Sequence, residues 1–240
     1  MMYLRSLLAP AVLPPEVEPE LVDAFLGDGK GVFVEVGANH PVVGSQTWRL
    51  EQRGWSGLLV EPLAERASEL RAGRRAMVEE VACGPRELHG TNGLLHVRNC
   101  HSTLTVHGGD AGVAFTEHRQ VPIRTLDSLL EKAAIERCDF LSIDVEGFET
   151  EVLKGTSLGR LQPRLVLIED KARSFDAHGF MKRAGYKRVR RTGVNSWYVP
   201  SAIAFPLSLF GRLQLFRKYV VAVPFHRLGY RLKRWRLSHA

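Results

Sequence analysis

Two carboxylates, each near the end of an apolar stretch, are the side chains of this sequence best placed to recognise a cofactor. Glu35 lies in "VFVEVG", two positions before Gly37, and Glu61 lies in "LLVEP", 24 positions after that glycine. Apolar stretches of this length are typical of buried strands, and in an α/β sheet cofactors dock where a strand passes into its turn. The two carboxylates therefore suit the recognition of amino or hydroxyl groups.

The spacing of glycines after the first stretch bears on which cofactor binds. A dinucleotide site needs the pattern G-x-G-x-x-G, but the next glycine after Gly37 is Gly44. A single glycine beside an acidic residue suits S-adenosylmethionine, which carries an amine, a carboxylate and a ribose. We expect Glu35 to hold the amino group or to orient the turn that does, and the amides around Asn39 to bind the carboxylate.

The second and third apolar stretches are expected to bind the nucleoside. Glu61, at the tip of its strand, can accept hydrogen bonds from both ribose hydroxyls. Ala82 and Cys83, in "EEVACG", are expected to flank the adenine. Two alternatives stay open: Glu35 is a charge on an edge strand, and Glu61 is a charge favoured by the N-terminus of the following helix.

A second group of acids lies in "SIDVEGFE", where Asp144 ends a strand and Glu146 and Glu149 follow. A hydroxyl nucleophile benefits from a base that removes its proton, and we expect Asp144 or Glu146 to be that base or to bind substrate hydroxyls. A divalent cation held with Glu169 or Asp170 is a less favoured arrangement, and we predict no metal site. The alternative is that Glu146 and Glu149 cap the following helix.

Histidines add one further candidate. His101, in "CHSTLTVH", is an alternative base because imidazole titrates near neutral pH, although a histidine in a solvated turn would look the same. His107, His118 and His178 lack the spacing of metal ligands, which argues against a zinc site.

These residues need an alternating α/β framework to hold them. The pattern predicts five strands, at 31–37, 56–62, 75–84, 138–147 and 163–171, with helices at 44–54, 63–73, 148–155 and 174–185. Residues 85–120 suggest a small β insertion, followed by a short strand and a helix capped near Thr125 or Asp127, and 186–200 a closing hairpin. Strands alternating with helices indicate a mostly parallel sheet with helices on both faces.

The same motifs, in this order, resemble FkbM-type S-adenosylmethionine-dependent methyltransferases. The resemblance spans about residues 31–170, and its most specific part pairs "TLDSLL" with "IDVEGFETEVLKG". It implies the Rossmann-like class I methyltransferase fold, with a seven-stranded sheet whose last strand is antiparallel. It also implies methyl transfer to a hydroxyl of a small molecule, sugar, glycan or glycolipid. The segment "HPVVGSQT" after Asn39 departs from the family pattern, in which small residues are common.

By position, the resemblance carries family roles onto two sets of residues. The residues that match its cofactor motifs are Glu35, Gly37, Asn39 and Glu61. The residues that match its acidic motif on the fourth strand are Asp144, Glu146 and Glu149.

Charge divides the chain unequally. Residues 1–176 carry 19 basic and 26 acidic residues, a net charge of −7, whereas the rest carry 14 basic residues and no acid. We expect an N-terminal segment at 1–30, the methyltransferase domain at 31–200 and a basic, hydrophobic tail at 201–240. In the tail Phe210, Phe216 and Trp235 accompany the arginines, as in segments that lie on anionic membranes. A helix packed on the sheet, or a disordered end, is the alternative.

Other function classes fit less well. The missing glycines argue against a nucleotide-dependent oxidoreductase, and no module for specific nucleic-acid binding is recognisable. A non-catalytic protein that binds membrane surfaces through its basic tail is the remaining alternative. Three cysteines without C-x-x-C spacing suggest a reducing compartment, and no apolar run is long enough to span a membrane. We therefore expect a cytoplasmic protein, with peripheral attachment to the inner face of the membrane as a further expectation.

Overall fold

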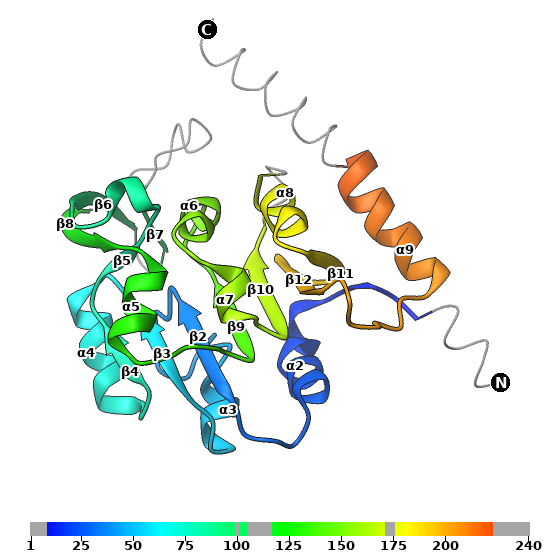
Figure 1. The fold of residues 1–240 in the computed structure, drawn as a ribbon, viewed down its shortest axis with the longest axis horizontal. Coiled ribbons are helices and arrows are strands. Elements are labelled where there is room, and N and C mark those ends of the chain that lie inside the picture. Colours follow the sequence, from blue (N-terminus) through cyan, green and yellow to red (C-terminus); the bar gives the residue numbers. More distant parts are fainter. Residues whose placement is uncertain (1–8, 99–100, 105–116, 171–175, 223–240) are drawn as a thin grey trace, which may run out of the picture.

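The computed structural model describes residues 9–98, 101–104, 117–170 and 176–222. Its main sheet has the order β1-β11-β12-β10-β9-β2-β3-β4 (Figure 1). These strands are β1 (Val12–Leu13), β2 (Val32–Val36), β3 (Ser56–Val60), β4 (Met77–Glu79), β9 (Phe140–Ile143), β10 (Leu165–Glu169), β11 (Tyr186–Thr192) and β12 (Asn195–Pro200). From β4 through β3, β2 and β9 to β10 all pairings are parallel, and β12 runs antiparallel to both β10 and β11. The expected Rossmann-like methyltransferase architecture is thereby confirmed.

Helices cover both faces of this sheet. The helices are α2 (Glu18–Leu26), α3 (Trp48–Gln52), α4 (Ala64–Gly73), α5 (Leu126–Lys132), α6 (Glu149–Lys154), α7 (Leu158–Leu161), α8 (Asp176–Arg183) and α9 (Leu209–Phe216), with short turns η1 (Pro15–Val17), η2 (Arg86–Leu88) and the π-helical η3 (Arg217–Ala222). Because side chains alternate along a strand, Val34 and Val36 belong to the core cluster that includes residues of α5, α6 and α8, whereas Phe33 belongs to the cluster that includes residues of α2, α3 and α4. Helix α5 begins as predicted, with the Thr125 hydroxyl accepting from the Ser128 amide.

The predicted insertion forms a second sheet of order β5-β8-β6-β7, near the carboxyl ends of β3 and β4 (Figure 1). Its strands are β5 (Ala82–Cys83), β6 (Asn92–Arg98), β7 (His101–Thr103) and β8 (Glu117–Arg124). The strand predicted at 75–84 is therefore two: β4 stays in the main sheet, and β5 pairs with β8. This turn of the chain from one sheet to the other carries Ala82 and Cys83 to the boundary between them.

Both ends of the described chain meet at the far edge of the main sheet. The two-residue β1 adds an eighth strand to the predicted seven, because it pairs with β11. Helix α9 lies along that edge (Figure 1) and contacts both strands. Within the described ranges, no helix has the length and apolar character needed to cross a membrane.

Candidate active site

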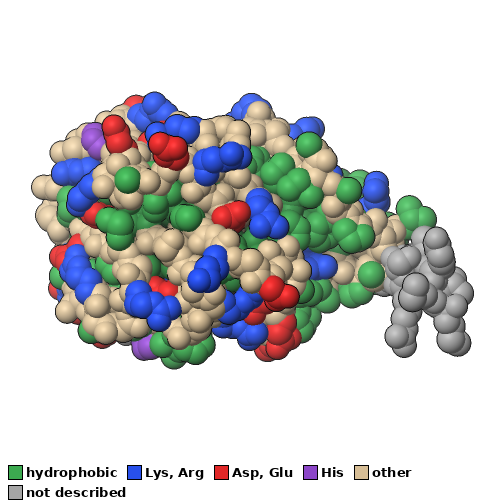
Figure 2. All heavy atoms as spheres, turned by 60° about the horizontal axis from the view of Figure 1, so that its bottom comes forward, with side chains coloured by type: hydrophobic (Ala, Val, Ile, Leu, Met, Phe, Trp, Pro, Cys, Tyr) green, Lys and Arg blue, Asp and Glu red, His purple; other side chains and the backbone are tan. Residues whose placement is uncertain are grey.

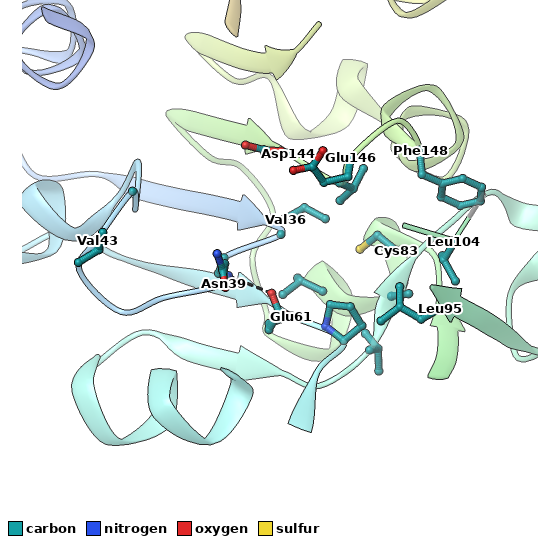
Figure 3. Close-up of a pocket in the computed structure, with 18 residues that line it drawn as sticks. Val36, Asn39, Val43, Glu61, Cys83, Leu95, Leu104, Asp144, Glu146 and Phe148 are labelled. Carbon is teal, nitrogen blue, oxygen red and sulfur yellow. Dashed lines mark hydrogen bonds between the residues drawn. The ribbon is translucent and has the colours of Figure 1, made fainter. Parts of the chain in front are cut away.

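A cavity of about 240 Å³ opens at the carboxyl ends of β2, β3 and β9, next to β5 of the second sheet (Figure 3). The turn after β2 supplies Gly37 and Asn39 to its lining, and β3 supplies Glu61, the residue that follows its last position. Asp144 and Glu146 border it from the turn after β9. This position agrees with the rule that ligands of open α/β sheets bind outside the carboxyl ends of the strands.

Gly37 allows two strand ends to approach closely. Its φ is +85°, and a Cβ at this position would lie 1.8 Å from the carbonyl oxygen of Asp144. The amide of Gly37 donates to the carbonyl of Val60 (2.9 Å), which holds the turn against β3 as well. A side chain here would push the turn after β2 away from the turn after β9, so the glycine sets the shape of the cavity.

Glu61 fixes the turn after β2 and remains part of the cavity wall. Its Oε2 accepts from the Asn39 amide (2.9 Å) and its Oε1 from the Leu63 amide (3.0 Å), and Asn39 has a left-handed φ of +49°. Burial raises the pKa of Glu61, while these two amides act in the opposite direction. A carboxylate has about four lone-pair sites, so two further donors can bind.

Glu35 is not in the lining of this cavity. The Gln46 amide (2.8 Å) and the hydroxyls of Ser45 (3.0 Å) and Thr47 (2.5 Å) donate to its carboxylate. Burial raises the pKa of Glu35, and these hydrogen bonds and Arg74 oppose the rise. Glu35 was expected either to hold the amino group of the cofactor or to orient the turn after β2. Its contacts are those of a residue that orients this turn.

Asp144 and Glu146, at the opposite side of the cavity, form an acidic cluster with Glu169, which lies behind the lining. Oxygens of Asp144, Glu146 and Glu169 all lie within 4.8 Å of one another, and Asp144 and Glu146 project from the turn above Val36 (Figure 3). Glu146 has a left-handed φ of +54°. Such a cluster can accept a proton from a hydroxyl group or bind several hydroxyls, and oxygen ligands of this kind also suit a hard cation.

Comparison with known proteins identifies the family of the chain. Residues 35–188 match the model of the methyltransferase FkbM domain, which covers more than half of the chain and all of the cavity residues named above. The chain belongs to the FkbM methyltransferase family. No curated protein matches it. The expected family is confirmed, and with it a methyltransferase of an S-adenosylmethionine-dependent class.

In this FkbM methyltransferase, the side of the cavity beyond Glu61 is apolar. Ala82 and Cys83 line it, as expected for residues that flank an adenine, together with Leu95, Leu104 and Phe148 (Figure 3). Burial raises the pKa of the Cys83 thiol, so this cysteine stays protonated and adds apolar surface. The last three residues were not predicted, because two come from the insertion and its place over the cavity depends on pairing distant in sequence.

Glu149 lies outside the cavity lining, at the first position of α6. Its Oε1 accepts from the Gly147 amide (2.8 Å), in the turn before the helix, and α6 has no side-chain cap hydrogen bond at its N-cap, Phe148. Burial, helped by the charge of Glu169, raises the pKa of Glu149 to about 7. This residue is therefore a structural neighbour of the acidic cluster.

His101, the alternative base, belongs to β7, where its backbone pairs with Arg98 of β6. Its side chain lies outside the part of the chain that the structure describes, so its catalytic role stays a prediction.

Arg74 is the main site-supporting residue that the sequence did not reveal. Its guanidinium donates to Glu51 Oε2 (3.0 Å), to the carbonyl of Pro41 (3.1 Å) and to Thr47 Oγ1 (2.9 Å), and its side chain is fully buried. It thereby ties the segment "HPVVGSQT", the departure from the family pattern, to α3. No motif marks it, because an arginine after a helix is usually a solvated charge.

Proposed function

We propose that this methyltransferase transfers the methyl group of S-adenosylmethionine to a hydroxyl of a sugar, glycan or glycolipid. The observation that carries the proposal is that two sides of one cavity differ in chemistry. A turn with Glu61 as acceptor faces the cavity from one side, and the carboxylates of Asp144 and Glu146 face it from the other. The first suits a nucleoside, and the second suits a neutral, proton-donating acceptor.

The residues present fit the cofactor. The remaining lone pairs of Glu61 suit both ribose hydroxyls, and the apolar surface of Ala82, Cys83 and Phe148 suits the adenine. Gly37 and Asn39 offer backbone at the cavity wall for the methionine end. When bound, the cofactor supplies an electrophilic methyl group on a positively charged sulfur.

The protein residues then have two tasks. The first is to hold the acceptor oxygen in line with the methyl group, and positioning of this kind supplies much of the acceleration of a displacement reaction. The second is to take the proton that the hydroxyl loses as its new bond to carbon forms. Asp144 or Glu146 takes this proton, and the negative cluster also favours a positively charged sulfur nearby. The products are the methyl ether, S-adenosylhomocysteine and one proton.

The chemistry of the acidic side supports this acceptor class. Carboxylates bind hydroxyl groups well, and sugars present several hydroxyls on one rigid ring, so two acids can orient one and deprotonate another. A phosphate or carboxylate acceptor would be repelled by Asp144 and Glu146. The free and buried Cys83 and Cys138 fit a reducing compartment, so we place the reaction in the cytoplasm.

The test is methyl transfer from labelled cofactor to cell extract fractionated into free sugars, glycans and glycolipids, with mass spectrometry of the product. We expect a methyl ether in a carbohydrate fraction. Asp144→Asn should lower the rate by about 100-fold or more while S-adenosylhomocysteine still binds, because shape is kept and the base is lost. The matched control is Asp28→Asn, whose side chain is fully exposed away from the cavity. A methylated amine as the product, or normal turnover by Asp144→Asn, would reject the proposed chemistry.

A further inference from the structure

Helix α9 and the η3 turn present an apolar stripe to solvent. Leu209 is 71% exposed, Leu213 62% and Phe216 55%. Because positions three and four apart lie on one face of a helix, these residues form one row. The full set of exposed large apolar side chains on this segment, here named the α9 stripe, is Leu209, Phe210, Leu213, Phe216, Val220 and Val221. Figure 2, which shows one side of the molecule, likewise has hydrophobic side chains gathered toward the end that carries α2 and α9.

The opposite face of the segment is anchored, so the α9 stripe cannot turn inward. Leu215 and Tyr219 are buried, and a Cβ on Gly211 would lie 2.9 Å from the Cβ of Ala11. The Tyr219 hydroxyl accepts from Arg191 Nη1 (2.8 Å) and lies 2.6 Å from Ser196 Oγ. The Ser208 hydroxyl caps α9 by accepting from the Gly211 amide (2.8 Å). The apolar row therefore faces outward because the other face is already packed against the sheet edge.

Basic residues accompany the stripe. Arg212 and Arg217 are exposed and Lys218 is half-buried, and the sequence contains no acid after Asp176. Residues 223–240 continue this composition with five further Lys and Arg residues. An outward row of Leu and Phe beside Lys and Arg is the composition of helices that lie in a membrane interface.

Charge decides between the possible occupants of this face. A second copy of the chain, packed stripe to stripe, would bring Arg212 and Arg217 of both copies together with no acid from this segment to pair with them. A surface of anionic phospholipid offers negative charge beside an apolar layer, which matches both parts of the face, and each basic residue near it adds to the attraction.

We propose that the α9 stripe docks this protein on anionic phospholipid membranes, with Leu213 and Phe216 inserted at the interface and Arg212 and Arg217 at the lipid phosphates. Helix α9 runs in the direction of the carboxyl ends of the parallel strands, where the cavity opens (Figure 1). Docking through α9 therefore holds the cavity at a fixed distance from the lipid. The membrane contact does not depend on the proposed methylation of a hydroxyl, and binding is measured without cofactor or acceptor.

The experiment is sedimentation of the full chain with vesicles of phosphatidylglycerol and phosphatidylcholine, and with phosphatidylcholine alone. Leu213→Ser/Phe216→Ser removes two members of the stripe without changing the charge. Met77→Ser/Leu88→Ser removes two exposed apolar residues, 47% and 38% exposed, from β4 and η2 as a matched control. Point variants are used because a truncation at Pro200 would also remove the buried Leu215 and Tyr219.

The wild-type chain and the control should bind anionic vesicles at low salt, and the stripe variant should bind them about tenfold more weakly or worse. Weak binding to phosphatidylcholine alone, and release by high salt, should accompany this result. Three results would overturn the proposal: a wild-type chain that ignores anionic vesicles, a stripe variant that binds as the wild type does, or equal binding to both lipids. Light scattering without vesicles completes the test by measuring the oligomeric state. If the wild-type chain is a dimer that does not bind vesicles, and the stripe variant is a monomer, the stripe binds a second copy of the chain and the proposal is wrong.

Discussion

Replacing Glu61 tests the nucleoside half of the site. In Glu61→Ala the ribose would lose two charge-assisted hydrogen bonds, each contributing about 1.5–3 kcal/mol. Hydrogen bonds from the ribose to water offset part of this lost binding energy, but even a net loss of about 1.4 kcal/mol lowers the affinity tenfold. We therefore expect S-adenosylhomocysteine to bind at least tenfold more weakly.

The same change has a structural cost that must be separated from the loss of ribose contacts. The amides of Asn39 and Leu63 donate to Glu61, and both lose their acceptor in the alanine variant. Leaving a buried donor unsatisfied costs about 1–3 kcal/mol, so the melting temperature should fall as well. Titration calorimetry with S-adenosylhomocysteine should therefore be run well below the melting temperature of the variant, after circular dichroism has shown that it is folded.

Glu65→Ala is the matched control. Glu65 is the second residue of α4, pairs with Arg119 at the surface and is outside the cavity lining. It should bind the ligand as the wild type does. An unchanged affinity in a folded Glu61→Ala protein would refute the assignment of Glu61 to the ribose.

Two further predictions concern the acids around the site. Burial raises the pKa of Glu149 from 4.5 to about 7, so its stabilising contribution is fully present below pH 4.5 and is lost as the pH rises through about 7. In denaturant unfolding, the free energy of unfolding of the wild type should fall by an amount on the order of 3 kcal/mol through this window, and that of Glu149→Gln should not. Parallel plots of the free energy of unfolding against pH would contradict the raised pKa of Glu149. Addition of EDTA should leave methyl transfer unchanged, because removal of a hydroxyl proton needs a base and not a Lewis acid; activity lost in EDTA and restored by Mg²⁺ would show that Asp144, Glu146 and Glu169 hold a required cation.

The strands that bear the site could be read from the sequence because each is a short apolar run closed by a glycine or an acid. The split of 75–84 into β4 and β5 could not, since the apolar pattern is the same whether a residue pairs with β3 or with β8. For the same reason the position of Leu95 and Leu104 over the cavity was not predicted. Pairing between distant segments decides both.

Glu35 and α9 show the limit of reading side-chain direction from a pattern. Alternation along β2 implies that Glu35 and Val36 point to opposite faces, but not which face opens to the cavity. The structure directs Glu35 to the side of Ser45 and Thr47, and leaves Val36 at the cavity. The amphipathic pattern of α9 likewise fits both a packed and a membrane-facing helix. One face packs against β1 and β11, and the other is exposed.

The most direct test is a crystal structure of the protein with S-adenosylhomocysteine, because it shows at once where the nucleoside and the sulfur lie. We expect both ribose hydroxyls within hydrogen-bond distance of Glu61, the adenine against Ala82 and Cys83, and the sulfur open to the side of the cavity that carries Asp144 and Glu146. A ligand bound elsewhere, or one in this cavity with its ribose away from Glu61 and its sulfur turned from those acids, would contradict the proposed site.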